Sequence, residues 1–377
     1  MAGSFSREQL MFAFSMMADL SAGQLGPEID IEVPLASHFV DILTTFKPEL
    51  GTWELVWGPA VRVPNSFSPP INTMFVVRSV DDPSRLVVAI SGTNPFSAFD
   101  WLIEDERVFM ERDWMTGSPA PGLTPKVANG TDRGMGILLA MMPGPGVPGV
   151  GTRLTDFLGG LPPGPLDITV TGHSLGGALA PAFALWLNDS PGEWDKAGRG
   201  LLSCVAYAGP TPGNGDFATY YASTSLATRT TRIHNSLDVV PHAWAAADLT
   251  EVPDLYNPPI KPDLLVNGLA RLAQIISSRG DYTQVLADAP AFEGAVNTAP
   301  GILTLLTPFQ HFIAELVHQH VEAYFIELGI PDDLHDALNQ IRDSVQLLGP
   351  QGEIATFAKR LAANLASHLP DEFPFPG

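Results

Sequence analysis

A serine between glycines is the feature of this sequence whose residue types and spacing can do chemistry. The motif Gly-His-Ser-Leu-Gly-Gly occupies residues 172–177, with Ser174 as its third residue, and follows the apolar run 168–171 directly. A strand that delivers a serine into a tight turn before a helix leaves the hydroxyl exposed, and a Cβ beside it would collide with the neighbouring strand and helix. The apolar run 178–187 continues as the expected helix. We therefore expect Ser174 on a strand–turn–helix elbow, as a nucleophile.

Such a serine needs three further groups, because its hydroxyl is a poor nucleophile on its own. They are a base, a carboxylate that orients the base, and donors for the developing oxyanion. Asp238 lies just after a predicted strand that ends at His234, where a turn can aim its carboxylate at an imidazole. In enzymes that carry their nucleophile on such an elbow, the acidic residue comes after the serine in the sequence, and the histidine comes after the acidic residue. This order excludes His38, His173 and His234, and His242 follows Asp238 too closely.

Five histidines remain as the base, namely His311, His318, His320, His335 and His368. His320 directly precedes the amphipathic stretch 321–328, which suits a loop histidine at the start of a late helix. We favour His320 and leave His318 and His311 open. His311, Glu315 and His318 also share a helical spacing that a metal ion could use, but a single match of this kind is weak and serine chemistry needs no metal. No cofactor is expected.

Two backbone amides are candidates for the oxyanion donors. One is the N–H of Leu175, immediately after the serine, and the other belongs to a loop after an earlier central strand. The sequence Ile90-Ser91-Gly92-Thr93 supplies such a loop, and Thr93 can offer both its amide and its hydroxyl. Loss of one oxyanion donor typically costs about 2.7–4 kcal/mol of transition-state stabilisation.

The elements that must position these groups read as an α/β chain. Continuous apolar runs alternate with helical segments, which indicates a mostly parallel sheet with helices on both faces. Expected strands are 75–78, 86–90, 168–171, 202–207 and 230–234, and expected helices include one capped by Ser6, then 152–158, 263–278, 332–347 and 353–368. The segment 143–151 is rich in Gly and Pro and is expected to be a loop. The helix at 263–278 either covers the active site or packs on the sheet.

Composition limits the partners of the chain. Its formal net charge of −21 disfavours nucleic acid and anionic lipid surfaces, whereas neutral esters stay compatible. No apolar run approaches the length of a membrane span, so no transmembrane segment is predicted. The N-terminal stretch 10–17 reads as a packed helix rather than a signal peptide, which leaves the compartment open between cytoplasm and secretion. Cys204, the single cysteine, is expected to be buried and excludes an intrachain disulfide.

Together these residues resemble the class 3 lipases, the fungal-lipase-like branch of the α/β-hydrolases, over residues 75–329. The resemblance is carried by 88–93 with 100–102 after it, 172–177, 207–214 and 232–241. It implies Ser174, Asp238 and His320 as the catalytic triad, with Thr93 and Leu175 in the oxyanion hole. Thr211 departs from the family, which usually has Arg there, and this change is expected to alter local packing.

The resemblance also implies an apolar segment after Thr93. Phe96, Phe99, Trp101 and Leu102 lie where family members carry a mobile amphipathic lid over an acyl pocket. The alternative is that these side chains are fixed parts of the pocket wall.

We therefore predict one α/β-hydrolase domain across residues 1–377. It consists of an N-terminal helical segment (1–60), a lipase-like core (75–329) with a helical cap inserted at about 242–281, and a C-terminal helical extension (330–377). The predicted activity is a lipase that cleaves acylglycerols or related lipid esters, at a lipid–water interface, through an acyl-enzyme. A non-lipolytic esterase or a phospholipase with the same triad, and a non-catalytic binding protein, are the alternatives. The oligomeric state is left open.

Overall fold

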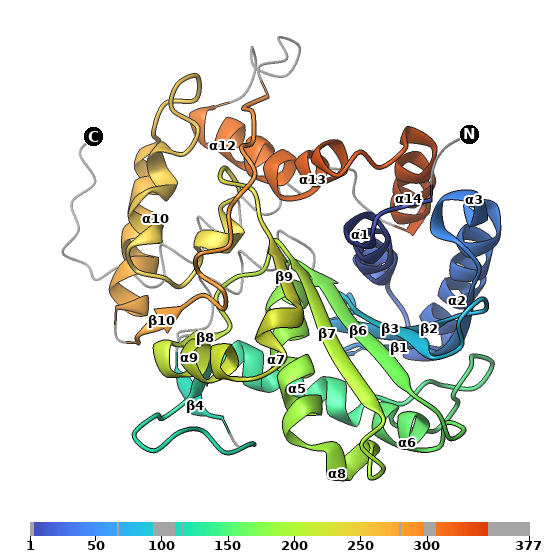
Figure 1. The fold of residues 1–377 in the computed structure, drawn as a ribbon. Coiled ribbons are helices and arrows are strands. Elements are labelled where there is room, and N and C mark those ends of the chain that lie inside the picture. Colours follow the sequence, from blue (N-terminus) through green and yellow to red (C-terminus); the bar gives the residue numbers. More distant parts are fainter. Residues whose placement is uncertain are drawn as a thin grey trace.

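The computed structural model describes residues 4–65, 68–92, 110–114, 116–278, 280–297 and 307–345. A six-stranded sheet of order β1-β2-β3-β6-β7-β9 forms its centre (Figure 1). The strands are β1 Trp53–Arg62, β2 Asn72–Ser79, β3 Arg85–Ile90, β6 Leu166–His173, β7 Gly200–Tyr207 and β9 Thr230–Ile233. Strand β2 pairs antiparallel with β1 and β3, whereas β3, β6, β7 and β9 pair in parallel. The predicted mostly parallel sheet is confirmed.

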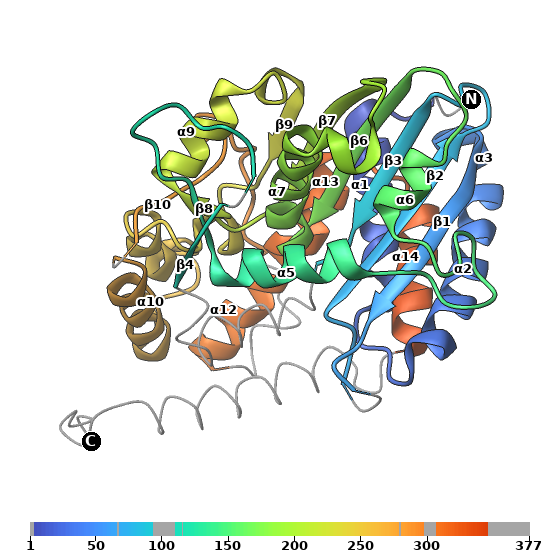
Figure 2. The ribbon, with the colours of Figure 1, turned by 90° about the horizontal axis from the view of Figure 1, so that it is seen from below.

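Alternate side chains of the central strands enter two separate apolar cores, as the two-residue period of a strand requires. In β2, Phe75 and Val77 enter the core beneath α1 and α2, whereas Met74 and Val76 enter the core beneath α5 and α7. Figures 1 and 2 show these two helical layers on opposite faces of the sheet. The first layer contains α1 Arg7–Ala18, α2 Glu28–Thr45, α3 Lys47–Leu50 and α14 Asp332–Val345, and the second contains α5 Asn129–Ala140, α6 Leu154–Gly159, α7 Leu175–Asp189 and α8 Pro191–Trp194.

The N-terminal segment is helical only in part. Ser6 caps α1 in a reciprocal capping box with Gln9, as expected. The last of the N-terminal helices, α3, ends at Leu50. Strand β1 then begins at Trp53, inside the segment 1–60 that was predicted to be helical. Strand β1 is not recognisable from the sequence pattern because its centre is Gly58-Pro59. The register of β1 against β2 shifts on both sides of Trp57, and an irregular edge strand tolerates a proline.

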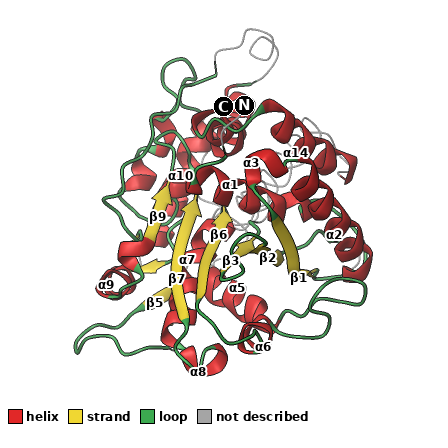
Figure 3. Cartoon of the chain, turned by 45° about the vertical axis from the view of Figure 1, so that its right-hand side comes forward, coloured by secondary structure: helices red, strands yellow, loops and turns green. Residues whose placement is uncertain are grey.

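A second, small sheet was not predicted. Its order is β10-β8-β5-β4, and its strands are only two or three residues long. One of them, β5, is labelled in Figure 3 beside the strands of the central sheet. They are β4 Glu111–Asp113, β5 Lys126–Ala128, β8 Gly213–Asn214 and β10 Tyr282–Thr283, with helix α9 Gly215–Ser223 following β8. Strand β10 pairs antiparallel with β8 and so belongs to this small sheet and not to the central one.

The segment after Asp238 contributes to a third apolar core. Helix α10 Leu264–Ser277 confirms the predicted helix, and its buried face includes Val266, Leu269 and Ala273. This face packs with Val239, with helix α12 Pro308–Val317 and with the short 3-10 turns η5 Asp248–Thr250 and η6 Val252–Asp254. Helix α14 matches the first predicted C-terminal helix, and the second, at 353–368, lies outside the described residues. Cys204 is buried in β7, as expected.

Candidate active site

Ser174 occupies a strained turn between strand β6 and helix α7. Its φ and ψ are 59° and −126°, a conformation that L residues rarely adopt. A Cβ at Gly172 would touch the carbonyl of Gly176, and a Cβ at Gly176 would touch the carbonyl of Ile90. The backbones of strand, turn and helix therefore approach so closely that only glycine fits, which confirms the predicted elbow.

The structure brings three predicted side chains together at this elbow. His320 Nε2 lies 2.8 Å from Ser174 Oγ, and His320 Nδ1 lies 3.0 and 2.9 Å from the two carboxylate oxygens of Asp238. The exposed fractions are 1% for Ser174 and 0% for both Asp238 and His320. Because the carboxylate can only accept, it fixes the Nδ1–H tautomer and leaves the Nε2 lone pair facing the hydroxyl. Of the three histidines left open, His320 is the one hydrogen-bonded to Ser174.

Two expectations about these side chains are wrong. Ser174 is almost fully buried, so its hydroxyl is not exposed on the elbow. In addition, His320 does not lie in a loop, because it belongs to the π-helical turn η7 His318–Glu322 between α12 and α13 Ala323–Glu327. A π-turn inserts one extra residue into a helix, and such turns are frequent at functional sites.

A tyrosine that the sequence analysis did not single out holds the carboxylate. The hydroxyl of Tyr324 donates to Asp238 Oδ2 at 2.9 Å and accepts the backbone N–H of Asn235 at 3.0 Å. The N–H of Val240 donates to Asp238 Oδ1 at 3.0 Å. Burial, together with the charge of Asp238, raises the pKa of Tyr324 well above its ordinary value, so the hydroxyl stays a donor. The one signal in the sequence was a tyrosine four residues after the favoured histidine.

A buried polar chain supports the π-turn from behind. Gln319 Nε2 donates a hydrogen bond to Glu315 Oε1 at 2.6 Å, and Asn235 Nδ2 donates a hydrogen bond to Gln319 Oε1 at 2.6 Å. Glu315, the middle residue of the helical spacing His311–Glu315–His318, thus accepts a hydrogen bond from the side-chain amide of Gln319. The described part of the chain contains no group of three or more His, Cys, Asp or Glu that could hold a metal ion.

One of the two predicted oxyanion donors can be placed. Leu175 is the first residue of the 15-residue helix α7. The first N–H groups of a helix have no partner within it, and the helix dipole adds positive potential at this end. The other donor, Thr93, and the predicted lid or acyl-pocket residues Phe96, Phe99, Trp101 and Leu102 fall outside the described residues.

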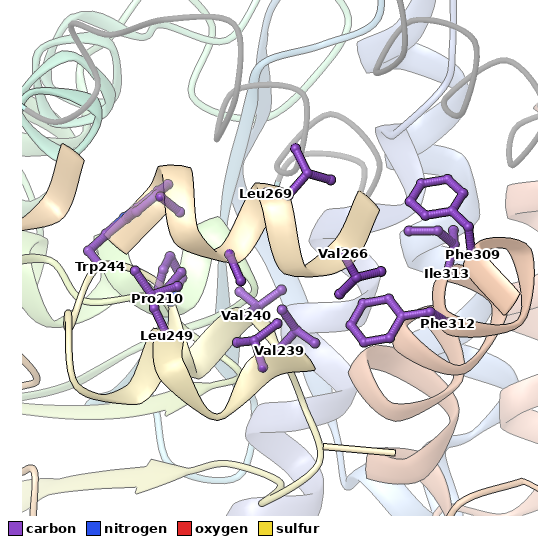
Figure 4. A pocket seen from close by; sticks show the side chains of 14 residues that line it. Pro210, Val239, Val240, Trp244, Leu249, Val266, Leu269, Phe309, Phe312 and Ile313 are labelled. Atoms are coloured by element: carbon purple, nitrogen blue, oxygen red, sulfur yellow. The ribbon is translucent and has the colours of Figure 1, made fainter. Parts of the chain in front are cut away.

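An apolar cavity of about 50 Å³ lies between helix α10, helix α12 and the loop that follows Asp238 (Figure 4). Val239 and Val240, which directly follow Asp238, form part of its wall, and Val266 and Phe312 face it from the two helices. The other lining residues are Pro210, Ala243, Trp244, Leu249, Val252, Leu269, Ala270, Ala273, Phe309 and Ile313. A cavity of this composition does not hold water well and favours apolar groups.

Comparison with known proteins agrees with this fold. The family model described as lipase (class 3) matches residues 154–247. The solved structure of M37 lipase is 31% identical in sequence, with a TM-score of 0.78, and the match covers 96% of this chain and 100% of that chain. Lipase II from Rhizopus niveus is 20% identical, with a TM-score of 0.43, over 64% of this chain and 76% of that chain. The comparison with curated proteins found no match.

The parallel sheet, the serine elbow and the M37 lipase match define an ester-hydrolysing enzyme with the α/β-hydrolase fold. More narrowly, the chain belongs to the class 3 lipase family. Within the described ranges, no helix has both the length and the apolar composition that crossing a membrane requires.

Proposed function

We propose that this enzyme cleaves lipid carboxylic esters through an acyl-enzyme, with Ser174 as nucleophile, His320 as base and Asp238 as the group that orients the base. Ser174 Oγ attacks the ester carbonyl carbon while His320 Nε2 takes the hydroxyl proton. The carbonyl oxygen becomes an oxyanion, for which the N–H of Leu175 and Thr93 are the proposed donors. The hydrogen-bonded chain Ser174–His320–Asp238 is the observation that carries this proposal.

The remaining steps follow from the same geometry. When the tetrahedral intermediate collapses, the carbon–oxygen bond to the alcohol breaks, and His320 returns its proton to the leaving alkoxide. Water then attacks the acyl-enzyme with His320 again as base, which releases the acid and restores Ser174. In both steps Asp238 stabilises the imidazolium and keeps it oriented. The hydroxyl of Tyr324 keeps the carboxylate in place without competing for the proton.

Acylglycerols or related lipid esters, met at a lipid–water interface, are the proposed substrates. The apolar cavity beside the Asp238 loop supports an acyl chain as ligand. The net charge of −21 disfavours binding to anionic lipid surfaces, whereas it is compatible with neutral ester substrates. We also propose that residues 1–377 form one domain, in which the segment 242–281 is a cap inserted into the lipase core and the residues after 330 are an extension.

The nucleophile is tested with Ser174→Ala. We expect hydrolysis of p-nitrophenyl butyrate to fall by about 10⁴- to 10⁶-fold, because the residual rate comes only from binding and oxyanion stabilisation. Covalent labelling by a fluorophosphonate should disappear in the same variant. Labelling that persists in Ser174→Ala, or a wild-type enzyme indifferent to the probe, would refute the assignment.

The base is tested with two histidines that lie two positions apart. His320→Ala should lose at least about 10⁴-fold in kcat, since no other imidazole is hydrogen-bonded to Ser174 in the described structure. His318→Ala is the matched control, because His318 is half-buried on the same turn and should keep nearly full activity. The reverse pattern would move the base to His318.

The substrate class is tested by measuring the hydrolysis of tributyrin, triolein and phosphatidylcholine side by side, below and above the solubility limit of tributyrin. A lipase should hydrolyse both triglycerides and accelerate when droplets form. Activity confined to dissolved tributyrin would indicate an esterase, and a preference for phosphatidylcholine would indicate a phospholipase.

A further inference from the structure

A second carboxylate, from the N-terminal part of the chain, reaches the back of the site. Asp19 begins the 3-10 turn η1 Asp19–Ser21, which directly follows helix α1. Its Oδ1 accepts the backbone N–H of Gly92 at 2.6 Å, and its Oδ2 lies 3.2 Å from Nδ1 of His173. The Asp19 side chain is 17% exposed and His173 only 2%. Asp19 lies far outside the residues 154–247 that match the class 3 lipase model.

The other nitrogen of the His173 ring is bonded to the backbone of the proposed base. His173 Nε2 lies 2.8 Å from the carbonyl oxygen of His320, and the two ring centres are 4.7 Å apart. A carbonyl oxygen can only accept a hydrogen bond, so Nε2 of His173 carries a proton. The ring thus ties the π-turn that carries His320 to the end of strand β6, one residue before Ser174.

The contact between His173 Nδ1 and the Asp19 carboxylate also requires a proton. A deprotonated Nδ1 would direct its lone pair at the carboxylate of Asp19, which also has only lone pairs to offer. The close approach of the two groups therefore requires one further proton between them. Either His173 is an imidazolium beside an ionised Asp19, or Asp19 is protonated and donates to a neutral ring.

Asp19 also holds the backbone of Gly92, which lies against the elbow of Ser174. A Cβ built on Gly92 would lie 2.8 Å from both Ser174 Cβ and the carbonyl oxygen of His173, so the Gly92 backbone lies directly against the elbow. The N–H that fixes this backbone donates to Asp19. One carboxylate therefore restrains the end of strand β3, the end of strand β6 and, through His173, the turn of His320.

We propose that Asp19 is a positioning residue for ester hydrolysis, which acts through His173 to hold the backbones of His320 and Gly92 in register with Ser174. The proposal rests on the triad function proposed above. Asp19 itself touches neither the nucleophile nor the base through its side chain. Its contribution is the placement of their backbones, to which an attack geometry is highly sensitive.

The test compares two substitutions of Asp19 with p-nitrophenyl butyrate as a soluble substrate. Asp19→Ala removes both hydrogen bonds, and we expect kcat to fall by roughly 10- to 100-fold while KM changes by less than about threefold, as for misplaced reacting groups. In Asp19→Asn, the amide oxygen can accept from Gly92 and the amide nitrogen can donate to Nδ1 of a neutral His173. This variant should therefore recover most of the lost kcat. Fluorophosphonate labelling rates should follow kcat.

The control is Asp41→Ala, which removes an exposed carboxylate from helix α2 and should leave kcat unchanged. Wild-type kcat in a folded Asp19→Ala enzyme, or an Asp19→Asn variant no better than Asp19→Ala, would overturn the proposal. Both outcomes differ from failure of the triad, which would appear as activity and labelling that survive in Ser174→Ala.

A measurement on the unmodified enzyme covers the case in which Asp19→Ala does not fold. The ¹⁵N signals of the His173 ring and the ¹³C signal of the Asp19 carboxyl group report where protons reside. We expect Nε2 to be protonated and one further proton on either Nδ1 or the carboxyl group. An unprotonated Nδ1 beside an ionised Asp19 would contradict the pairing on which the proposal depends.

Discussion

Two imidazole–carboxylate pairs lie next to each other in this enzyme, and they differ in what the far nitrogen of each ring meets. In the pair of His320 and Asp238, the far nitrogen faces the hydroxyl of Ser174, which can give up a proton. In the pair of His173 and Asp19, it faces a backbone carbonyl, which cannot. The same two chemical groups can therefore serve as a base in one place and as a backbone clamp in the other.

The carboxylates of the two pairs also differ in what surrounds them. Asp238 is completely buried and accepts hydrogen bonds from His320, Tyr324 and Val240. Asp19 is partly exposed, and its second hydrogen-bond donor is the backbone of Gly92. The donors around Asp238 fix its carboxylate against the ring of His320, where it can stabilise an imidazolium that forms during the reaction, whereas in our proposal Asp19 only has to hold its neighbours in place.

The largest expected difference between the pairs comes from the same Asp→Asn change in each. In Asp238→Asn, an amide N–H facing Nδ1 forces the other tautomer, so that Nε2 carries a proton and can no longer accept one from Ser174. We expect kcat to fall by about 10⁴-fold, as for other triads with this change. Asp19→Asn should cost less than about fivefold, because a clamp needs hydrogen bonds but no proton transfer.

Both variants are compared by kcat on p-nitrophenyl butyrate, with folding checked by circular dichroism. Equal losses in the two variants would break the distinction between base and clamp. A large loss in Asp19→Asn alone would mean that the charge of Asp19, and not its hydrogen bonds, matters to the reaction.

A smaller effect is expected from Tyr324→Phe, which removes the hydroxyl that holds Asp238 and leaves the N–H of Asn235 without its acceptor. A hydrogen bond to a charged group contributes about 1.5–3 kcal/mol and a buried unpaired N–H costs about 1–3 kcal/mol. We expect kcat to fall by about tenfold, together with a lower free energy of unfolding, measured by urea titration.

Tyr220→Phe is the matched control for this change. The hydroxyl of Tyr220 also donates to a carboxylate, that of Asp189, and accepts a backbone N–H, that of Ser118, but neither group belongs to the site. Its loss should lower stability and leave kcat unchanged. If both variants lost the same activity, the role of Tyr324 would be structural only.

The smallest effect concerns a third imidazole, that of His234. Burial, and then electrostatic interaction with Arg232 and His242, lower the pKa of His234 from 6.5 to about 4, although the charge of Asp238 acts in the opposite direction. The folded protein therefore binds fewer protons here than the unfolded chain between these values, so this contribution to stability is complete above pH 6.5 and is lost as the pH falls towards 4. Urea midpoints measured from pH 7.5 to 4 should show this loss.

In His234→Gln the acid-side loss should be smaller, because the amide oxygen can still accept from Arg232 and has no proton to gain. Identical pH slopes in the variant and the wild type would show that other groups cause the acid destabilisation.

The predictions from sequence succeeded where local pattern and backbone geometry coincide. The elbow at Ser174 requires glycines because the backbones of the strand, the turn and the helix are in contact there, and these glycines can be recognised in the sequence. The buried strands β3, β6 and β7 are equally visible, because strands covered on both faces are continuously apolar. Strand β1 was missed because its pattern is interrupted by Gly58-Pro59, and the second sheet because its strands are too short for any periodicity.

For the site, too, the sequence predicted some features and not others. Chain order placed Asp238 after the serine and restricted the base to later histidines, but several histidines satisfied that order, and only distance separated His320 from His318. The burial of Ser174 was predicted wrongly, because covering a hydroxyl depends on segments far away in the chain.

The sequence by itself determined the elbow at Ser174, the position of Asp238 after a strand and the parallel sheet that carries both, since each depends on contacts within a few residues or on a simple period. Only the tertiary structure decided which imidazole meets Ser174 and that Asp19, 155 positions before Ser174 in the numbering, contacts Gly92 and His173 next to it. The physical reason is that a hydrogen bond needs two groups within about 3 Å in a fixed orientation. For groups more than a hundred residues apart, only the packing of whole helices against the sheet brings them to that distance.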